Sequence, residues 1–188
     1  MPYTPEHLSI IMRAMSEAAE VARRIIKSNR YMTLATRGSN DLGQPGVWAN
    51  AVAYAYDSDA NLYWYSAVDA LHSSNIKQNP DIAITIFNST EPSDIVDGLQ
   101  LACTISEVDA DHLGEIMALY FMQSFPSEED RKAWERPRVD FEGDAIRRFY
   151  MARINRAYKI DTDVVDVDRR LAVDIEEVRK LLHAADVS

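Results

Sequence analysis

Five polar side chains gather between residues 66 and 75, and their types and spacing are suited to holding an anion. They are Ser66, His72, Ser73, Ser74 and Asn75. Ser66 is expected to end a strand, and the helix that follows begins with backbone N–H groups that have no helical partner. Hydroxyl, imidazole and N–H donors beside a helix N-terminus form a cradle for an anionic group. Ordinary helix capping and surface polarity explain the same residues, and they are the simpler interpretation of the spacing alone.

Other catalytic signatures are missing from the sequence. The six glycines are scattered, and none forms a phosphate-binding loop. No serine lies in a Gly-x-Ser-x-Gly context. The histidines His7, His72, His112 and His183 are far apart and lack metal-ligand spacing, so no metal site is expected. Cys103 lies in an alternating strand and is predicted to be a core residue rather than a nucleophile. No catalytic residue is assigned.

Composition predicts one soluble domain over residues 1–188. The chain is 47% hydrophobic and 27% charged, and it carries a formal net charge of −10. That charge would repel a phosphate polymer, so nucleic acid is not an expected partner. No apolar run approaches the roughly 20 residues that span a bilayer, so no membrane partner is expected either. A single cysteine suits a reducing cytoplasm.

Apolar spacing predicts helices before, between and after a set of strands. Residues 5–28 carry an apolar stripe at helical spacing, with Thr4 as a cap and Pro5 at the first helical position. Asp69, Asp109, Ser127 and Asp174 are expected to cap further helices. Strands are predicted at residues 31–36, 47–56, 62–66, 82–87, 99–108 and 146–160. In the last of these, Ile154 and Tyr158 are expected to share one face.

The stretch from Val47 to Tyr56 alternates with unusual regularity. One face carries Trp48, Asn50, Val52, Tyr54 and Tyr56, and the other carries Val47, Ala49, Ala51, Ala53 and Ala55. A face made almost wholly of alanine lets a flat object approach the backbone closely. Periodicity leaves open whether that object is a packed helix or a planar ligand.

These elements predict an α+β fold built on a mostly antiparallel split β-barrel with flanking helices. Runs of strands joined by short connections favour a closed or half-closed barrel over alternating βαβ units. The barrel core is expected at residues 31–161, with inserted helices at 109–136. Residues 162–188 are expected to form a C-terminal extension.

The order of motifs resembles the barrel core of the pyridoxamine 5′-phosphate oxidase-like superfamily. In that family a Gly-x-Pro hairpin precedes an alternating strand. A strand ending in an aromatic residue and Ser or Thr follows, then a basic residue, Asn-Leu/Ile and Asn-Pro. This chain has Gly43-Gln44-Pro45, Tyr65-Ser66, His72, Asn75-Ile76 and Asn79-Pro80 in those places. The resemblance covers about residues 31–161.

The resemblance implies that the barrel binds FMN and acts as a flavin-dependent oxidoreductase on a small molecule. It implies a homodimer with the cofactor at the subunit interface. The phosphate would lie near Ser66 and His72, with Tyr65 and Asn75 close by. The isoalloxazine ring would run beside the alternating strand. The residues implied there are Ala49, Asn50, Ala51 and Val52.

The chain departs from the better-known flavin oxidases at their phosphate contacts. Those enzymes have an Arg-Lys pair where this chain has Leu71-His72, and an arginine near the position of Ala49. A subgroup of the family with histidine in place of the lysine is more similar to this sequence. The alternatives are a barrel that has lost flavin and serves as a non-catalytic binding module, or one that holds deazaflavin or haem.

Overall fold

Eight strands form one antiparallel sheet in the computed structural model, which describes residues 4–90, 98–161 and 169–186. The strands are β1 Tyr31–Ser39, β2 Pro45–Ala53, β3 Ala55–Tyr56, β4 Leu62–Ala67, β5 Asp81–Phe87, β6 Gly98–Glu107, β7 Arg147–Ile160 and β8 Arg170–Val173. Their order is β2-β1-β5-β6-β7-β4-β3, with β8 also paired to β7. Because β2 and β3 stand at opposite ends of that order with only Tyr54 between them, the sheet must curl. The predicted α+β split barrel is confirmed.

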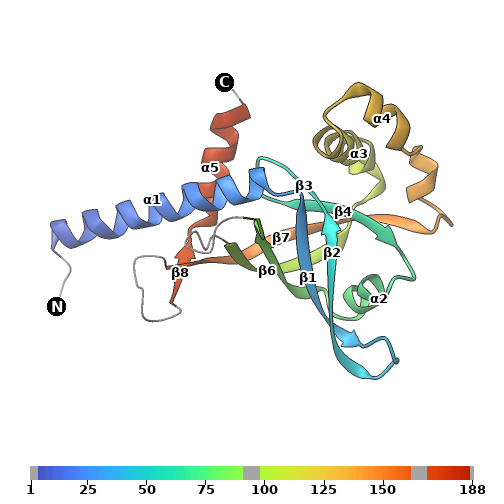
Figure 1. Cartoon of the computed structure of the whole chain (residues 1–188), viewed down its shortest axis with the longest axis horizontal. Coiled ribbons are helices and arrows are strands. Elements are labelled where there is room, and N and C mark those ends of the chain that lie inside the picture. The colour runs from blue at the N-terminus through green and yellow to red at the C-terminus, as the bar shows by residue number, and fades with distance from the viewer. Residues whose placement is uncertain (1–3, 91–97, 162–168, 187–188) are drawn as a thin grey trace.

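The helices lie around the rim of this curled sheet. They are α1 Pro5–Ser28, α2 Leu71–Gln78, α3 Ala110–Ser124, α4 Glu128–Trp134 and α5 Ile175–Asp186, with a 3₁₀ turn at Arg138–Phe141. In Figure 1, α1 and α5 cross at one end of the sheet, while α2 and the α3–α4 pair lie toward the other end. Asp109 and Ser127 cap α3 and α4 as predicted. In the described part of the chain, none of the helices is long and apolar enough to cross a membrane.

Two hydrophobic clusters make up the core. The larger one fills the barrel and includes Leu34, Trp64 and Ile84, together with the inward face of α1. The smaller one joins α3 to the outer side of β3, β4 and β7, where Ala55 and Phe149 are almost completely buried. Burial of apolar side chains is the main favourable contribution to folding, so these clusters fix where α3 stands. Cys103 is buried in the larger cluster, as predicted, and burial raises the pKa of its thiol to about 12.

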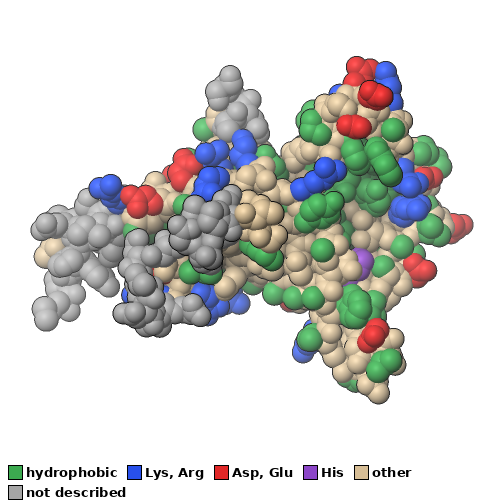
Figure 2. All heavy atoms as spheres, in the orientation of Figure 1, with side chains coloured by type: hydrophobic (Ala, Val, Ile, Leu, Met, Phe, Trp, Pro, Cys, Tyr) green, Lys and Arg blue, Asp and Glu red, His purple; other side chains and the backbone are tan. Residues whose placement is uncertain are grey.

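The helix α4 is attached to α3 through an exposed aromatic contact. The rings of Phe125 and Trp134 stack with centroids 6.1 Å apart and planes inclined by 5°. Trp134 nevertheless remains 61% exposed. Figure 2 shows hydrophobic side chains gathered between the two helices on this face of the molecule.

The predicted strand 47–56 is interrupted at Tyr54. The Tyr54 side chain is buried, and its hydroxyl donates to the backbone carbonyl of Ile26 at the end of α1. Its own N–H donates to the carbonyl of Arg30. At Tyr54 the chain stops pairing with β1, and from Ala55 it pairs with β4. The expected alanine face is therefore divided between two strands. Ala49 and Ala51 are exposed, whereas Ala55 is buried beneath α3.

The strand β7 contains a bulge that periodicity did not predict. Ala102 pairs with Arg156 but the next residue, Cys103, pairs with Ile154, which leaves Asn155 as the extra residue. Alternation therefore reverses at this point. Ile154 is buried inside the barrel, whereas Tyr158 lies on the outer face beside Arg156. Placing Ile154 and Tyr158 on one face was wrong for this reason.

The C-terminal segment returns to the sheet before it forms its helix. The strand β8 pairs with the end of β7, and sequence periodicity did not predict it. Asp174 then accepts hydrogen bonds from the N–H groups of Glu176 and Glu177, which is the predicted cap of α5. The rest of the expected extension, residues 162–168 and 187–188, lies outside the described residues.

Candidate functional site

The structure brings Ser66 and His72 together at the end of β4. The imidazole Nε2 of His72 lies 2.8 Å from the hydroxyl of Ser66. The His72 residue is only 7% exposed, and burial lowers the pKa of its imidazole from the usual 6.5. His72 is therefore neutral at neutral pH. It acts as a hydrogen-bonding partner for Ser66, not as a fixed cation.

The N-terminus of α2 stands next to this pair without a side-chain cap. Its N-cap residue is Ala70, and no side chain accepts a hydrogen bond from its first turn. The prediction that Asp69 caps this helix was wrong, because the helix begins one residue later. No acidic residue lies in the first turn. The partial positive charge of the helix end is thus not offset by a side chain of its own cap or first turn.

The mouth of the site is bordered by apolar and basic residues. The N–H of Val68 donates to the carbonyl of Ile146, and these side chains are 41% and 61% exposed. Arg148 stands opposite Ser66 in the β4–β7 ladder, and Arg147 stands opposite Ala67. The guanidinium of Arg148 donates to the carbonyls of Ala145 and Gly143, so it is tied to the turn before β7.

Asn75 belongs to the scaffold of the site. It is completely buried, and its side-chain oxygen accepts from the N–H of Ser39 at 2.8 Å. Its side-chain nitrogen donates to the Ser39 carbonyl and to the hydroxyl of Thr36. Asn75 thus fastens α2 to the β1–β2 hairpin. The close approach requires glycine at position 38, where a Cβ would lie 2.3 Å from the Asn75 side-chain oxygen.

Tyr65 also lies apart from the pair. Because side chains alternate along β4, Tyr65 faces α3 while Ser66 faces the barrel side. Its ring contacts those of Tyr120, Phe141 and Phe149 at centroid distances of 5.3–5.4 Å. Tyr65 therefore packs within the smaller hydrophobic cluster.

The predicted ring-binding residues of β2 divide between two faces. Ala49 and Ala51 are exposed on the outer face of the sheet. Val52 is buried in the barrel, and Asn50 is half-buried, with its amide donating to the carbonyl of Ala51. Only the two alanines can therefore offer a surface to a ligand on the outer face.

The exposed alanines continue across the sheet as a straight row. Ala49 pairs with Ala35, Ala35 with Ala83, and Ala83 with Ala102. Arg156 ends the row on β7. A shallow hollow of about 500 Å³ lies over these strands. Sequence reasoning missed Ala35, Ala83 and Ala102, although each is the small residue in its own alternating strand.

Large apolar side chains surround this alanine row and are exposed to solvent. Tyr31 is 58% exposed, Val47 75% and Phe87 51%. Together with the alanines they give the outer face of the sheet an apolar stretch, which Thr33, Gln100, Arg156 and Arg170 border. A surface of this kind marks an interaction site more often than an ordinary protein exterior.

Solved structures show which class of fold this is. A putative pyridoxamine 5′-phosphate oxidase from Listeria innocua superposes with a TM-score of 0.53 at 14% identity, covering 75% of this chain and 96% of that one. A haem-binding protein from Mycobacterium smegmatis gives a TM-score of 0.61 at 22% identity, over 87% of this chain and 60% of that one. A protein of unknown function from Agrobacterium tumefaciens gives a TM-score of 0.61 at 18% identity, over 84% of this chain and 61% of that one. The chain therefore has the split-barrel fold of these structures.

The family is given by a match to the family model described as "CREG, beta-barrel", which covers residues 13–111. The chain belongs to this family. Among curated protein sequences, none matches it. The chain spans about three fifths of the length of the Agrobacterium and Mycobacterium proteins. At these identities the structural likeness establishes the fold alone.

Proposed function

We propose that this chain is an FMN-binding homodimer that works as a flavin-dependent oxidoreductase on a small molecule. The observation that carries the proposal is the uncapped N-terminus of α2 beside the Ser66–His72 pair. Bound flavin would supply the hydride-transfer chemistry, and the barrel would supply orientation and shielding from solvent.

The residues at the mouth fit the phosphate end of the cofactor. Backbone N–H groups at a helix N-terminus favour an anion, and a hydroxyl beside them adds a donor. An anion at this point selects the His72 tautomer in which Nε2–H donates to Ser66, because the Ser66 hydroxyl is then free to donate to the phosphate. His72 would thus position Ser66. This arrangement stands in place of the Arg-Lys pair of the better-known oxidases.

The outer face of the sheet fits the flat end of the cofactor and a second copy of the chain. The alanine row allows close approach to the backbone, and the exposed Tyr31, Val47 and Phe87 would be buried by a partner. A two-fold dimer uses the same surface on both subunits, which a flat apolar face can do. The ring would then be held between two copies and kept from water.

Replacing Ser66 with alanine is expected to weaken FMN binding about 5- to 30-fold, because one charge-assisted hydrogen bond to the phosphate is lost. The measurement is quenching of flavin fluorescence during titration with protein. Ser58→Ala is the matched control, since Ser58 lies in the β3–β4 turn, away from the Ser66–His72 pair. Unchanged affinity in Ser66→Ala, or no binding by the wild type at about 100 μM FMN, would contradict the proposal.

Replacing Ala83 with glutamate is expected to convert the dimer into a monomer, because each subunit would bury a carboxylate against the other. Sedimentation should give a mass near twice 21.3 kDa for the wild type and near 21.3 kDa for the variant. Ala133→Glu on the exposed face of α4 is the control and should remain dimeric. A monomeric wild type would overturn the homodimer.

Haem is the second candidate, because the Mycobacterium smegmatis protein of similar fold binds haem by its description. His72 is the histidine at the mouth, and its Nε2 is already 2.8 Å from Ser66 in a nearly buried position. Axial coordination through that nitrogen would require this contact to break. Haem titration with detection of a Soret band distinguishes the two cofactors, and a band lost in His72→Ala would favour haem. A barrel that takes up neither cofactor would be the non-catalytic binding module.

A further inference from the structure

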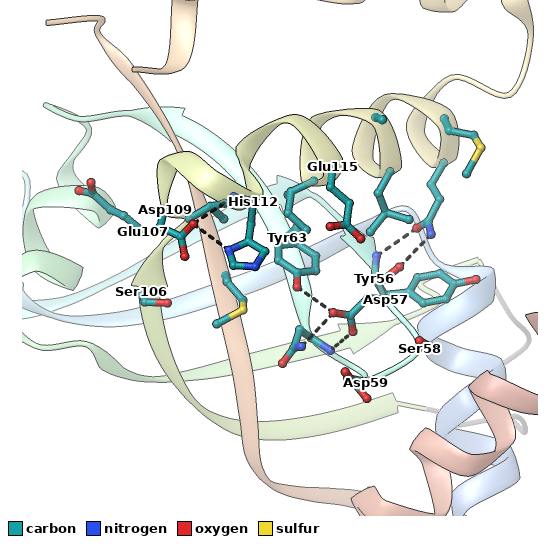
Figure 3. Close-up of a pocket in the computed structure, with 18 of the residues that line it drawn as sticks. Tyr56, Asp57, Ser58, Asp59, Tyr63, Ser106, Glu107, Asp109, His112 and Glu115 are labelled. Carbon is teal, nitrogen blue, oxygen red and sulfur yellow. Dashed lines mark hydrogen bonds and ion pairs between the residues drawn. The ribbon is translucent and has the colours of Figure 1, made fainter. Parts of the chain in front are cut away.

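A second and larger cavity lies on the opposite side of β4 from the Ser66–His72 pair. Its volume is about 820 Å³. It is enclosed by α3, the β3–β4 turn, β7 and the inner side of α5 (Figure 3). Because side chains alternate along β4, Tyr63 points into this cleft while Trp64 and Ser66 face the barrel. The volume falls within the usual range for small-molecule sites.

Carboxylates dominate the charge of the cleft. Asp57, Asp59, Glu107, Asp109 and Glu115 line it, and no Lys or Arg does so among the described residues. His112 also lines it and pairs with Asp109 at 2.8 Å, while Asp59 lies 3.2 Å from His183 and Glu107 lies 4.0 Å from Arg148. The acids come from the β3–β4 turn, the end of β6 and the exposed side of α3, so they are spread along the cleft. Within the described residues, no three metal-binding side chains form a group that could hold a metal ion.

Among the described residues, the hydrogen-bond donors to the Asp57 side chain are neutral groups. It accepts from the backbone and side-chain N–H groups of Asn61 at 2.8 and 2.9 Å, and from the hydroxyl of Tyr63 at 2.7 Å. Burial and the neighbouring Asp57 raise the pKa of the Tyr63 hydroxyl, so it remains a protonated donor. Figure 3 shows Glu115 on α3 facing this turn across the cleft.

The remaining walls are apolar and aromatic. Ile116, Leu119 and Met122 contribute one side of α3, and Met151 contributes from β7. Met122 is 57% exposed. Methionine side chains adapt to ligands of varied shape. The ring of Tyr56 stands beside Asp57, where an aromatic face can attract a cation, whereas Tyr63 is only 5% exposed and meets Asp57 through its hydroxyl (Figure 3).

We propose that this cleft binds a small organic cation with an apolar body, such as a substituted or quaternary amine. The positive group would lie between Asp57 and Glu115 and against the ring of Tyr56, while the apolar body would cover Met122 and Leu119. Charge complementarity excludes an organic anion of the same shape. The site is separate from the proposed flavin site, and it would stand if that proposal failed.

The test uses benzyltrimethylammonium as the probe, measured by isothermal titration calorimetry on the full chain. We expect saturable binding with one probe per chain and a dissociation constant in the millimolar range or tighter, weakened by added salt. Glu115→Gln, an exposed change on α3, should weaken binding about three- to tenfold. Asp57→Asn should weaken it further, although it also alters the β3–β4 turn. Glu129→Gln on α4 is the matched control and should bind as the wild type does.

Four results would overturn the proposal. The first is no saturable binding up to about 10 mM probe. The second is equal binding of benzenesulfonate, which has a similar size and the opposite charge. The third is unchanged affinity in Glu115→Gln and Asp57→Asn alike. The fourth is displacement of the probe by calcium at micromolar concentration, which would mean that the cleft is a metal site and not an amine site. FMN titration of the Glu115→Gln variant, expected to match the wild type, keeps this test distinct from that of the flavin site.

Discussion

Replacing Asn75 with alanine is expected to lower the free energy of unfolding by about 2–4 kcal/mol. Asn75 is completely buried, and its side chain meets the backbone of Ser39 on both its N–H and its carbonyl. Alanine would leave these two groups buried without partners, and a small cavity would remain where the amide was. Equilibrium denaturation in urea at fixed protein concentration measures the loss.

Asn79→Ala provides the matched control for this prediction. Asn79 follows α2 and also bonds to the β1–β2 hairpin, through the carbonyl and the guanidinium of Arg37. These contacts are exposed to solvent, so water can replace them, and the expected loss is below about 1 kcal/mol. If Asn75→Ala lowers the free energy of unfolding no more than the control does, the buried hydrogen bonds of Asn75 contribute little to stability.

Gly38→Ala tests the same contact between Asn75 and the β1–β2 hairpin by a change in the hairpin. Its Cβ would stand 2.3 Å from the Asn75 oxygen, so either the amide or the hairpin must move. Once Asn75 is alanine, that oxygen is gone and most of the clash disappears. The double variant should therefore lose less stability than the sum of the single variants, by about 1–3 kcal/mol. If the losses of stability in the two single variants add up in the double variant, the clash of the new Cβ is not with the Asn75 side chain.

Replacing Phe149 with alanine is expected to cost about 3–5 kcal/mol. The ring is 1% exposed and touches those of Tyr65, Tyr120 and Phe141, with centroid distances down to 4.7 Å. It is the point at which β7 meets α3 and the 3₁₀ turn. Truncation would remove the ring contacts and open a cavity that the surrounding aromatic side chains cannot fill.

Val139→Ala is the comparison for Phe149→Ala, because Val139 lies in the same 3₁₀ turn and is 68% exposed. Its expected effect is within about 0.5 kcal/mol. Near-ultraviolet circular dichroism should report the loss of aromatic order in Phe149→Ala alone. Equal stability of the two variants would mean that α3 is held mainly by other contacts.

The features that could be predicted from the sequence are those fixed by nearby residues. Asp109 and Ser127 cap their helices because a cap needs only the first turn that follows it. The positions of the barrel strands along the chain also followed, and spacing together with the family resemblance grouped Ser66 with His72, which the structure places 2.8 Å apart. Asp69 was misassigned because an acid one residue too early satisfies the same local pattern.

The remaining features depend on pairing between distant strands. The alanine row joins residues 35, 49, 83 and 102, and only the register of four strands shows that they are neighbours. Asn75 matched a motif position, but its burial against Ser39 depends on how α2 packs on the hairpin. The acidic cleft combines the β3–β4 turn with residues of α3, α5 and several strands, whose proximity no local period reveals.

The bulge at Asn155 has a consequence for comparing this chain with its relatives. Along β7 the buried positions on the barrel side are Tyr150, Ala152 and Ile154 before the extra residue, and Ala157 and Lys159 after it. A related protein that lacks the bulge would have one residue fewer between these two sets. If the two sequences are aligned without a gap at that point, interior residues of the relative are aligned with exterior residues of this chain for half the strand. Homologous residues would then be aligned out of register and the alignment score would fall. A single-residue gap at position 155 is therefore expected to recover sequence similarity in the C-terminal part of the barrel.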